Sequence, residues 1–546
     1  MDGLEGRSLM GNVSWTSLSP LSFLGRSAAV FPDKTAVVMD DRRVSYRDFA
    51  SEITRLAQAL RASGVTAGDR VACLCPNIPE LLAAHFAVPL AGGVIVAINS
   101  RLSGEEIRYI LDHSGAVLLI VDGELQARVS TVLDRAPRVR EVVVVGAETA
   151  PREDSAVVPH VDYAGFLARG SAEPLPWVVA DELAPISINY TSGTTGNPKG
   201  VVYNHRGAYL NSLSQILHSQ HSHDSVYLWT LPMFHCNGWC TGWALAAVAG
   251  TQVCLREVRG EVIWRLLKEE GVTHLNGAPT VLTTITDAPE AVRLDRELVV
   301  TVAGAPPSPT VIARMSALGA RVIHVYGLTE TYGPYTINEA QPGWAAETAD
   351  RRARLQSRQG VGMVTADPVR VVDGLMNDVP RDGTTMGEIV MRGNTVMAGY
   401  FRDPDGTAEA FQGGWFHSGD LGVMHPDGYV ELRDRAKDVV ISGGENIATI
   451  EVEHALGSHP AVLEAAVVGA PDEKWGEVVK AYVVLRPGQQ ASEEELLAHV
   501  RAQIARYKTP KTIVFVEELA KTSTGKMRKF ELREKEWAGH TRRIQG

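Results

Sequence analysis

The chain is poor in cysteine and lacks the cysteine patterns of disulfide-rich or zinc-binding proteins. Its 546 residues contain five cysteines, Cys73, Cys75, Cys236, Cys240 and Cys254. So few cysteines in so long a chain form no disulfide framework, and no Cys/His spacing resembles a structural zinc site. We therefore expect a reducing compartment.

The sequence also lacks a long apolar run and an excess of positive charge. The apolar stretch 83–98 is interrupted by a histidine, a proline and two glycines, and it is too short to span a bilayer. The opening MDGLEGRSLMGNV has no basic segment followed by an apolar one, so we expect no signal peptide. The net charge of −11 argues against a nucleic-acid or anionic-membrane binder. We expect a cytoplasmic protein without stable membrane insertion.

Length and periodicity predict an α/β protein of at least two domains. A chain of 546 residues is too long for one core. Strand-like runs at 35–39, 71–75, 93–98, 116–121 and 141–145 alternate with helical runs such as 45–63 and 79–91. This rhythm predicts a large N-terminal domain, residues 1–434, of βαβ-built sheets with covering helices. The polar segment 147–176 is expected to be an irregular surface excursion.

The pattern changes after Asp434, within the charged cluster 433–438. Helices are expected at 449–458 and 492–504, and strands at 462–469, 478–485 and 512–516. About a hundred residues are enough for an independent domain. We predict a small mobile C-terminal α+β domain over residues 435–546, with a hinge at 435–438.

The segment YTSGTTGNPKG at 190–200 is the most informative part of the chain. Its polar and small residues are Thr191, Ser192, Gly193, Thr194, Thr195, Gly196 and Lys199. Glycines let backbone N–H groups close around an anion, hydroxyls donate to phosphate oxygens, and lysine supplies a charge. The pattern predicts a polyphosphate-binding loop that differs from the common P-loop motif. The alternative is an ordinary turn between a strand and a helix.

Five further motifs point the same way: LPMFHCNGW at 231–239, VYGLTET at 325–331, WFHSGDLG at 415–422, DRAKDVVISGGENI at 434–447 and KTSTGK at 521–526. With these motifs in this order, the chain resembles the adenylate-forming enzymes from about residue 23 to residue 529. That superfamily contains acyl-CoA synthetases, peptide-synthetase adenylation domains and beetle luciferases, and the HCNGW motif resembles a medium-chain or aryl acyl-CoA ligase branch. The resemblance implies that ATP and a carboxylic acid form an acyl-adenylate, from which coenzyme A displaces AMP to give a thioester.

The resemblance also implies an ATP site. Glu330 is the expected Mg²⁺ ligand, and Thr329 is expected to bond the α-phosphate. The expected adenine contacts are Tyr326, Gly327, Gly304, Ala305 and Pro306. Asp420 is suited to accept both ribose hydroxyls, and Arg435 is expected to donate to the ribose. Charge neutralisation by a metal and by fixed donors is what the attack of one anion on another requires.

Lys526 is the expected catalytic residue of adenylation, because such a lysine in the family reaches the carboxylate and the α-phosphate. The second step then needs the small domain to rotate about Lys437. Rotation is expected to present a coenzyme A channel made by Ser442, Gly443, Gly444 and Glu445. His235 is expected to act as a gate between the ATP and acyl sites.

The acyl pocket is expected to begin at a helix that starts with the HCNGW motif. Its predicted residues are His235, Asn237, Gly238, Trp239, Val302, Ala303, Gly304, Gly327, Thr331, Tyr332 and Gly333. The indole of Trp239 would shorten the pocket or stack on a planar substrate, which favours a short, medium or aryl acid; the alternative is that Trp239 is core.

Several alternatives remain open at this point. Lys526 can be a solvated lysine, Glu330 a helix-start carboxylate and Asp420 a turn residue. The cluster His218, His221, His223 and Asp224 looks metal-like, but a solvated loop is favoured. The acceptor can be a carrier protein, the chemistry can be a luciferase-like oxidation, the acid can be nitrite activated for diazotisation, and the chain can be an inactive nucleotide-binding scaffold. The oligomeric state is also left open, with a homodimer as one alternative.

Overall fold

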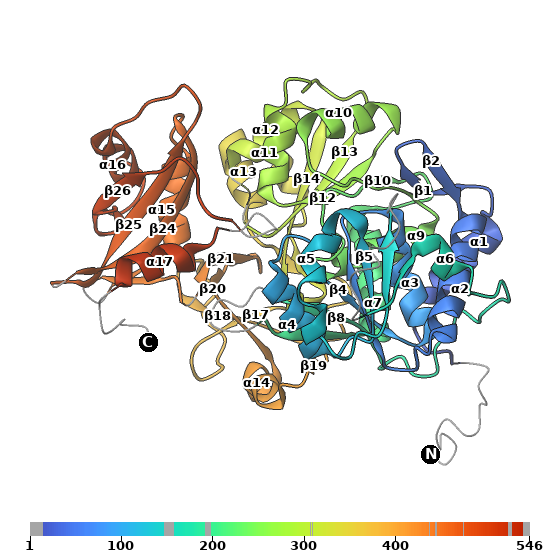
Figure 1. The fold of residues 1–546 in the computed structure, drawn as a ribbon. Coiled ribbons are helices and arrows are strands. Elements are labelled where there is room, and N and C mark those ends of the chain that lie inside the picture. The colour runs from blue at the N-terminus through green and yellow to red at the C-terminus, as the bar shows by residue number, and fades with distance from the viewer. Residues whose placement is uncertain are drawn as a thin grey trace, which may run out of the picture.

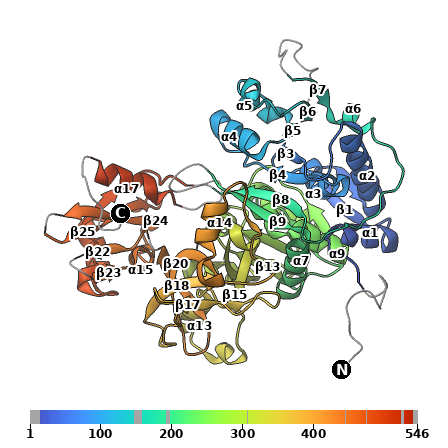
Figure 2. The ribbon, with the colours of Figure 1, turned by 90° about the horizontal axis from the view of Figure 1, so that it is seen from below.

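The chain folds into a large N-terminal region and a smaller C-terminal region beside it (Figure 1). The computed structural model describes residues 15–146, 158–191, 198–305, 307, 309–435, 437–442, 445–472, 474–521 and 527–538. Figures 1 and 2 show the C-terminal region at one end of the molecule and helices α1 (Leu21–Val30) and α2 (Tyr46–Ala62) at the opposite end.

The first large sheet carries the predicted phosphate loop. Within the described residues its strand order is β19-β9-β8-β4-β3-β5-β6-β7. The strands are β3 (Arg70–Leu74), β4 (Val94–Ala97), β5 (Leu118–Asp122), β6 (Val142–Val145), β7 (His160–Asp162), β8 (Pro185–Tyr190), β9 (Gly200–Asn204) and β19 (Gly399–Tyr400). The strands from β4 to β7 pair in parallel, whereas β9 pairs antiparallel with both β8 and β19.

The second large sheet has the order β16-β15-β14-β13-β12-β10-β11-β1-β2 over the described residues. The strands are β1 (Thr35–Met39), β2 (Arg42–Ser45), β10 (Val226–Leu228), β11 (Thr251–Val253), β12 (His274–Gly277), β13 (Leu298–Val302), β14 (Ala320–Leu328), β15 (Gly333–Ile337) and β16 (Val361–Gly362). The central strands are parallel, so their carboxyl ends meet at one edge of the sheet.

Helices fill three layers around these two sheets. One apolar cluster joins α3 (Pro79–Ala91), α7 (His205–Ser219) and α9 (Thr241–Val248) to strands of both sheets, so these helices lie between the sheets. Helices α4 (Gly104–Ser114) and α5 (Gln126–Ser130) cover the outer face of the first sheet. Helices α10 (Gly260–Glu269), α11 (Pro279–Asp287) and α12 (Pro309–Ala317) cover the second. The remaining helices of this region are α6 (Tyr163–Leu167), α8 (Cys236–Trp239), α13 (Ala349–Gln356) and α14 (Pro404–Ala410).

A smaller antiparallel sheet leads from the large region to the C-terminal one. Its order is β17-β18-β20-β21, with β17 (Arg370–Val372), β18 (Met386–Met391), β20 (Phe416–Met424) and β21 (Val430–Arg435). The predicted hinge, residues 435–438, therefore starts at Arg435, the last residue of β21.

The C-terminal region is a mixed sheet with helices on both faces, in which β26 pairs in parallel with β25 and the other pairs are antiparallel. Its strands are β22 (Val440–Ser442), β23 (Glu445–Ile447), β24 (Val462–Asp472), β25 (Gly476–Leu485) and β26 (Thr512–Phe515). Helices α15 (Thr449–Gly457) and α16 (Glu493–Arg501) pack on one face, and α17 (Lys529–Trp537) lies against the other. The predicted fold class, α/β with a small α+β region, is confirmed.

Two sequence expectations need correction. The segment 147–176 is not irregular throughout, because its described part contains β7 and α6, and α6 buries Phe166; residues 147–157 lie outside the described residues. The solvated loop expected at the cluster of residues 218–224 is only partly correct: His223 and Asp224 are exposed, whereas His221 is buried, with its ring centroid 4.5 Å from that of His274. Burial, with His274 as a second cause, lowers the pKa of His221 to about 3. No cluster able to hold a metal occurs among the described histidines, cysteines and carboxylates.

All five cysteines are buried free thiols, as expected. Across the described ranges, no helix is both long enough and apolar enough to cross a bilayer.

Candidate active site

The predicted phosphate loop joins two antiparallel strands. Tyr190 at the end of β8 pairs with Gly200 at the start of β9. At the base of the loop, the Thr191 N–H donates to the Lys199 carbonyl at 3.0 Å, and the Lys199 N–H donates to Thr191 Oγ1 at 3.4 Å. The loop is therefore the end of a hairpin and not a turn between a strand and a helix. Ser192, Gly193, Thr194, Thr195 and Gly196 lie outside the described residues.

The side chain of Lys199 lies against the strand β19. Its Nζ is 4.4 Å from the centroid of the Tyr400 ring and 3.6 Å from Asp403 Oδ2. A lysine between an aromatic face and a carboxylate keeps a defined direction while its ammonium stays half-exposed to solvent.

Glu330 and Thr329 lie in the short 3₁₀ turn η4 (Thr329–Thr331), which joins β14 to β15. Glu330 Oε1 accepts a hydrogen bond from the Tyr400 hydroxyl at 2.9 Å. The hydroxyl of Tyr203 donates to the Thr329 carbonyl at 2.5 Å, and Cys236 Sγ lies 3.5 Å from Thr329 Oγ1. The carboxylate and the hydroxyl predicted to meet the phosphates are thus in one turn, next to the HCNGW segment.

Asp420 of β20 contacts Arg435 of the neighbouring strand β21 and also Tyr326, the predicted adenine contact. It pairs with Arg435 in the β20–β21 ladder, and Arg435 Nε lies 3.4 Å from its Oδ1. The hydroxyl of Tyr326 donates to Asp420 Oδ2 at 2.7 Å. Burial first, and then the Asp420 charge, raise the pKa of Tyr326, so this hydroxyl remains a donor. The structure thus brings together the predicted ribose acceptor Asp420, the predicted ribose donor Arg435 and the predicted adenine contact Tyr326.

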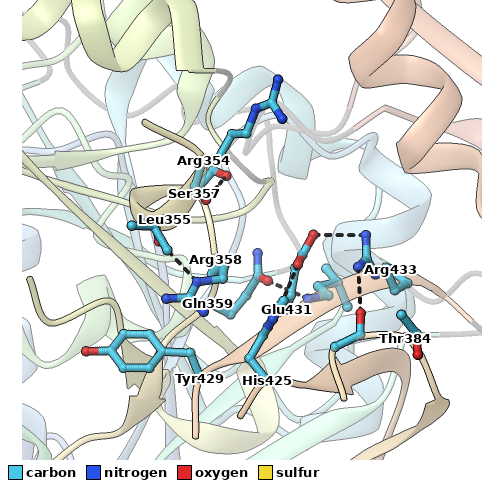
Figure 3. Close-up of polar contacts among 12 residues, drawn as sticks. Arg354, Leu355, Ser357, Arg358, Gln359, Thr384, His425, Tyr429, Glu431 and Arg433 are labelled. Carbon is cyan, nitrogen blue, oxygen red and sulfur yellow. Dashed lines mark hydrogen bonds and ion pairs between the residues drawn. The ribbon is translucent and has the colours of Figure 1, made fainter. Parts of the chain in front are cut away.

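A polar network fixes the strand β21, which carries Arg435 (Figure 3). Glu431 Oε2 pairs with His425 Nε2 at 2.7 Å, and Glu431 Oε1 with Arg433 at 3.0 Å. Although burial opposes ionisation, the His425 hydrogen bond and the charge of Arg433 lower the pKa of Glu431. Gln359 accepts the N–H of Leu432 in the same strand. These contacts hold the end of β21 in a fixed direction.

The HCNGW segment does not begin a right-handed helix. Five consecutive residues have positive φ: Cys236 at 47°, Asn237 at 42°, Gly238 at 55°, Trp239 at 57° and Cys240 at 62°. α8 is thus a left-handed turn, and the right-handed α9 starts only at Thr241. Left-handed conformations cost about 1–2 kcal/mol per non-glycine residue, and such strain gathers at functional sites. The expected helix start is therefore corrected to a strained turn.

Trp239 packs directly on β15. It is 4% exposed, and a Cβ added at Gly333 would lie 2.6 Å from the indole Cδ1. Trp239 shares an apolar cluster with Ala303, Val325 and Ile337. The indole therefore packs among residues that the sequence assigns to the acyl pocket, Ala303 and Gly333.

Three predicted pocket residues direct their side chains elsewhere. Val302 belongs to the cluster under α10–α12, on the other face of the sheet. The Thr331 hydroxyl accepts the Leu328 N–H at 2.9 Å and donates to the Gly333 carbonyl at 2.8 Å. The Tyr332 ring stacks on Tyr203 with 3.9 Å between centroids. Only the backbone of these residues is available to the pocket.

A small cavity lies on the other side of the left-handed turn. It has a volume of about 10 Å³, room for about one water, and Asn237 lines it with His85, Trp229, Met233 and Trp243 among others. The Asn237 N–H donates to Asn189 Oδ1 at 3.0 Å. Burial lowers the pKa of His85 to about 4, so His85 is neutral.

The predicted hinge and channel residues are described only in part. Lys437 is half-buried, and burial together with the charges of Arg435 and Arg533 lowers its pKa to about 8. Ser442 and Glu445 pair across the β22–β23 hairpin. Gly304 (φ +95°) and Ala305 are exposed just after β13. Gly327 lies so close to β15 that an added Cβ would be 1.9 Å from the Gly333 carbonyl oxygen. Pro306, Gly443, Gly444 and Lys526 lie outside the described residues; so does the whole segment 522–526.

Sequence reasoning missed three residues that contact the site. Tyr400 contacts both Lys199 and Glu330, Asp403 contacts Lys199, and Tyr203 supports the turn that holds Thr329. No local motif marks them. The pairing of β19 with β9 is what brings Tyr400 to the loop.

The chain belongs to the AMP-binding enzyme family, which matches residues 24–401, with the AMP-binding enzyme C-terminal domain matching residues 451–526. It is 44% identical to an acetate–CoA ligase of Humulus lupulus over 98% of each chain. It is 43% identical to a 2-methylpropanoate–CoA ligase of the same plant, and 41% identical to a 4-hydroxybutyrate–CoA ligase of Metallosphaera sedula, over 95% of each chain.

Solved structures agree with this assignment. ATP-bound MatB from Rhodopseudomonas palustris is 26% identical with a TM-score of 0.82, covering 95% of this chain and 99% of its own. The amide bond synthetase McbA from Marinactinospora thermotolerans is 26% identical with a TM-score of 0.80, covering 94% and 99%. The predicted class, an ATP-dependent, AMP-forming acid–thiol ligase, is confirmed.

Proposed function

We propose that this enzyme activates a short-chain carboxylic acid as its acyl-adenylate and transfers the acyl group to coenzyme A. The observation that supports a short acid is the Trp239 indole, which is packed on Gly333 at the end of the predicted pocket. The names of the full-length relatives, which act on acetate, 2-methylpropanoate and 4-hydroxybutyrate, point to the same size class.

The ATP site would use residues from several separate segments of the chain. Lys199 and the loop hydroxyls neutralise the phosphates, Tyr326 and the 304–306 turn hold the adenine, and Asp420 with Arg435 holds the ribose. Thr329 donates to the α-phosphate. Lys526, supplied from the domain 435–546, neutralises the reacting carboxylate and α-phosphate.

Mg²⁺ fits Glu330 because carboxylate oxygens are the ligands this hard cation prefers, and the hydrogen bond from Tyr400 to Oε1 orients this carboxylate. When bound, the metal would neutralise charge on the phosphate oxygens. Glu330 lies next to Thr329 in η4, so the turn would present both groups to the same part of the nucleotide.

The second step would follow rotation of the C-terminal domain, residues 435–546, about Lys437. Rotation withdraws Lys526 and brings Ser442, Gly443, Gly444 and Glu445 to the acyl-adenylate, while His235 gates the passage between the sites. The buried free thiols support a reducing compartment such as the cytoplasm.

One half-reaction assay tests this proposal. ATP–pyrophosphate exchange is measured with acetate, butyrate, 2-methylpropanoate, 4-hydroxybutyrate, octanoate, benzoate and nitrite, and product formation with each acid is then measured with and without coenzyme A. We expect exchange with the acids of two to four carbons and thioester only with coenzyme A. Exchange with nitrite alone, or an acyl product formed with an amine in place of coenzyme A, would overturn the proposal.

A further inference from the structure

The strand β19 brings a single tyrosine between two groups of the proposed ATP site. Gly399 and Tyr400 pair antiparallel with Val202 and Val201 of β9, and the Phe401 N–H donates to the Gly200 carbonyl at 2.7 Å. Side chains directly opposite each other, and those two residues apart on one strand, share a face of a sheet. Lys199, Val201 and Tyr400 therefore lie on one face, beside the phosphate loop.

Tyr400 uses its two ends for two different residues. Its ring face lies 4.4 Å from Lys199 Nζ, and its hydroxyl donates to Glu330 Oε1 at 2.9 Å. The two contacts are independent, because one depends on the aromatic ring and the other on the hydroxyl. The lysine and the carboxylate come from separate sheets, and Tyr400 contacts both.

The surroundings hold Tyr400 in this position. Its N–H donates to Thr407 Oγ1 at 2.9 Å, and its carbonyl accepts the Asp403 N–H at 3.2 Å. Asp403 caps α14 through the Gly406 N–H at 2.9 Å and directs its other oxygen to Lys199, 3.6 Å away. Next to this contact, the Met397 N–H donates to the Glu330 carbonyl at 2.7 Å. The backbone from Met397 to Asp403 thus supports both partners of Tyr400.

We propose that Tyr400 is a positioning residue for adenylation: its hydroxyl orients the Glu330 carboxylate toward the metal, and its ring holds Lys199 toward the phosphates. This inference rests on the proposed roles of Glu330 and Lys199. It predicts that the two functions of Tyr400 are separable by substitution.

The test measures ATP and AMP affinity by isothermal titration calorimetry at stepped Mg²⁺ concentrations, on the full chain. Tyr400→Phe keeps the ring and removes the hydroxyl. We expect it to raise the Mg²⁺ concentration required for half-maximal ATP affinity about tenfold, the scale of one hydrogen bond to a charged group, while ATP affinity without Mg²⁺ is unchanged. Tyr400→Leu removes both contacts, and we expect a further loss of ATP affinity, of about threefold, that does not depend on Mg²⁺.

Three controls separate the possible failures. Tyr46→Phe removes another tyrosine hydroxyl, one that donates to the Gly250 carbonyl at 2.6 Å, and should leave all these affinities unchanged. If Glu330→Gln and Lys199→Ala change the Mg²⁺ requirement and the ATP affinity but Tyr400→Phe does not, the positioning role is wrong and the proposed function stands. If neither Glu330→Gln nor Lys199→Ala has an effect, the proposed function itself fails. Loss of AMP and ATP affinity together in Tyr400→Phe would show a merely structural role and would also overturn the inference.

Discussion

The amine of Lys437 sits among cations at the junction of the two regions. Burial is the largest cause of its lowered pKa, and the charges of Arg435 and Arg533 add to it, against Asp420. Arg533 of α17 also forms an ion pair with Asp438, so the residues after the hinge are tied to the last helix. The folded chain therefore favours the neutral form of this lysine.

We expect the Lys437 amine to titrate near pH 8, whereas its ordinary value is 10.5. Between these two pH values the unfolded chain binds more protons than the folded one, so folded-state stability should rise with pH across the window. The checks are the pH profile of Lys437 acylation, read by mass spectrometry, and denaturant unfolding from pH 7 to 10.5. In Lys437→Met, residue 437 should no longer contribute to the rise of folded-state stability with pH. A reactivity midpoint above pH 10 would contradict the assignment.

At the scale of elements, the left-handed turn 236–240 is what places Trp239. The φ of 57° at Trp239 directs the indole onto Gly333. Gly333 permits this contact because it has no side chain, and its own φ is +93°. A glycine at position 239 would adopt this φ without strain, which offsets part of the ~3–5 kcal/mol that loss of a buried tryptophan costs. Trp239→Gly is thus a substitution that changes pocket length while the turn is retained.

We expect Trp239→Gly to move the preference toward longer acids. One methylene in an apolar pocket is worth about 1–3 kcal/mol, so the kcat/KM ratio of octanoate to butyrate should rise by more than about tenfold. A general loss of stability cancels in this ratio. The matched control is Trp344→Gly, which removes an 8% exposed tryptophan outside the pocket and should leave the ratio fixed. An unchanged ratio in Trp239→Gly would show that this residue only packs the core.

Most single elements could be predicted from the sequence, and their partners could not. The predicted elements 35–39 and 79–91 match β1 and α3 residue for residue, because both are buried on all sides and therefore stand out in the sequence as continuous apolar runs. Glu330, Asp420 and Arg435 were predicted because the motifs that contain them resemble those of a known family, and each motif is a short local stretch of sequence. Tyr400 was missed because its role depends on the pairing of β19 with β9, across about 200 residues of chain. The side-chain direction of Val302 and the left-handed turn likewise depend on tertiary packing.

At the scale of the whole molecule, the proposed rotation must break contacts that cross the hinge. Asp434 of β21 is buried and accepts both the N–H and the hydroxyl of Thr449, the latter at 2.7 Å. Lys529 of α17 donates to the same Thr449 hydroxyl oxygen at 2.7 Å and pairs with Glu453 at 2.7 Å. These bonds connect the large region to both faces of the small one. They define one orientation of the two regions, and a second orientation requires new φ and ψ angles at the hinge.

We expect Lys437→Pro to separate the two half-reactions. Proline fixes φ near −65° and restricts the preceding residue as well, which opposes rotation but leaves the residues of the ATP site in place. ATP–pyrophosphate exchange should persist, while thioester formation from the same acid falls more than about tenfold. Lys437→Ala, which removes the amine but keeps φ free, should retain both steps. If Lys437→Pro forms the thioester as fast as Lys437→Ala does, the hinge lies elsewhere and the domain boundary at 434/435 must be moved.

We expect Lys526→Ala to give the opposite pattern. ATP–pyrophosphate exchange should fall at least ~10²-fold, the scale of one lost charged donor, while coenzyme A still reacts with supplied acyl-adenylate.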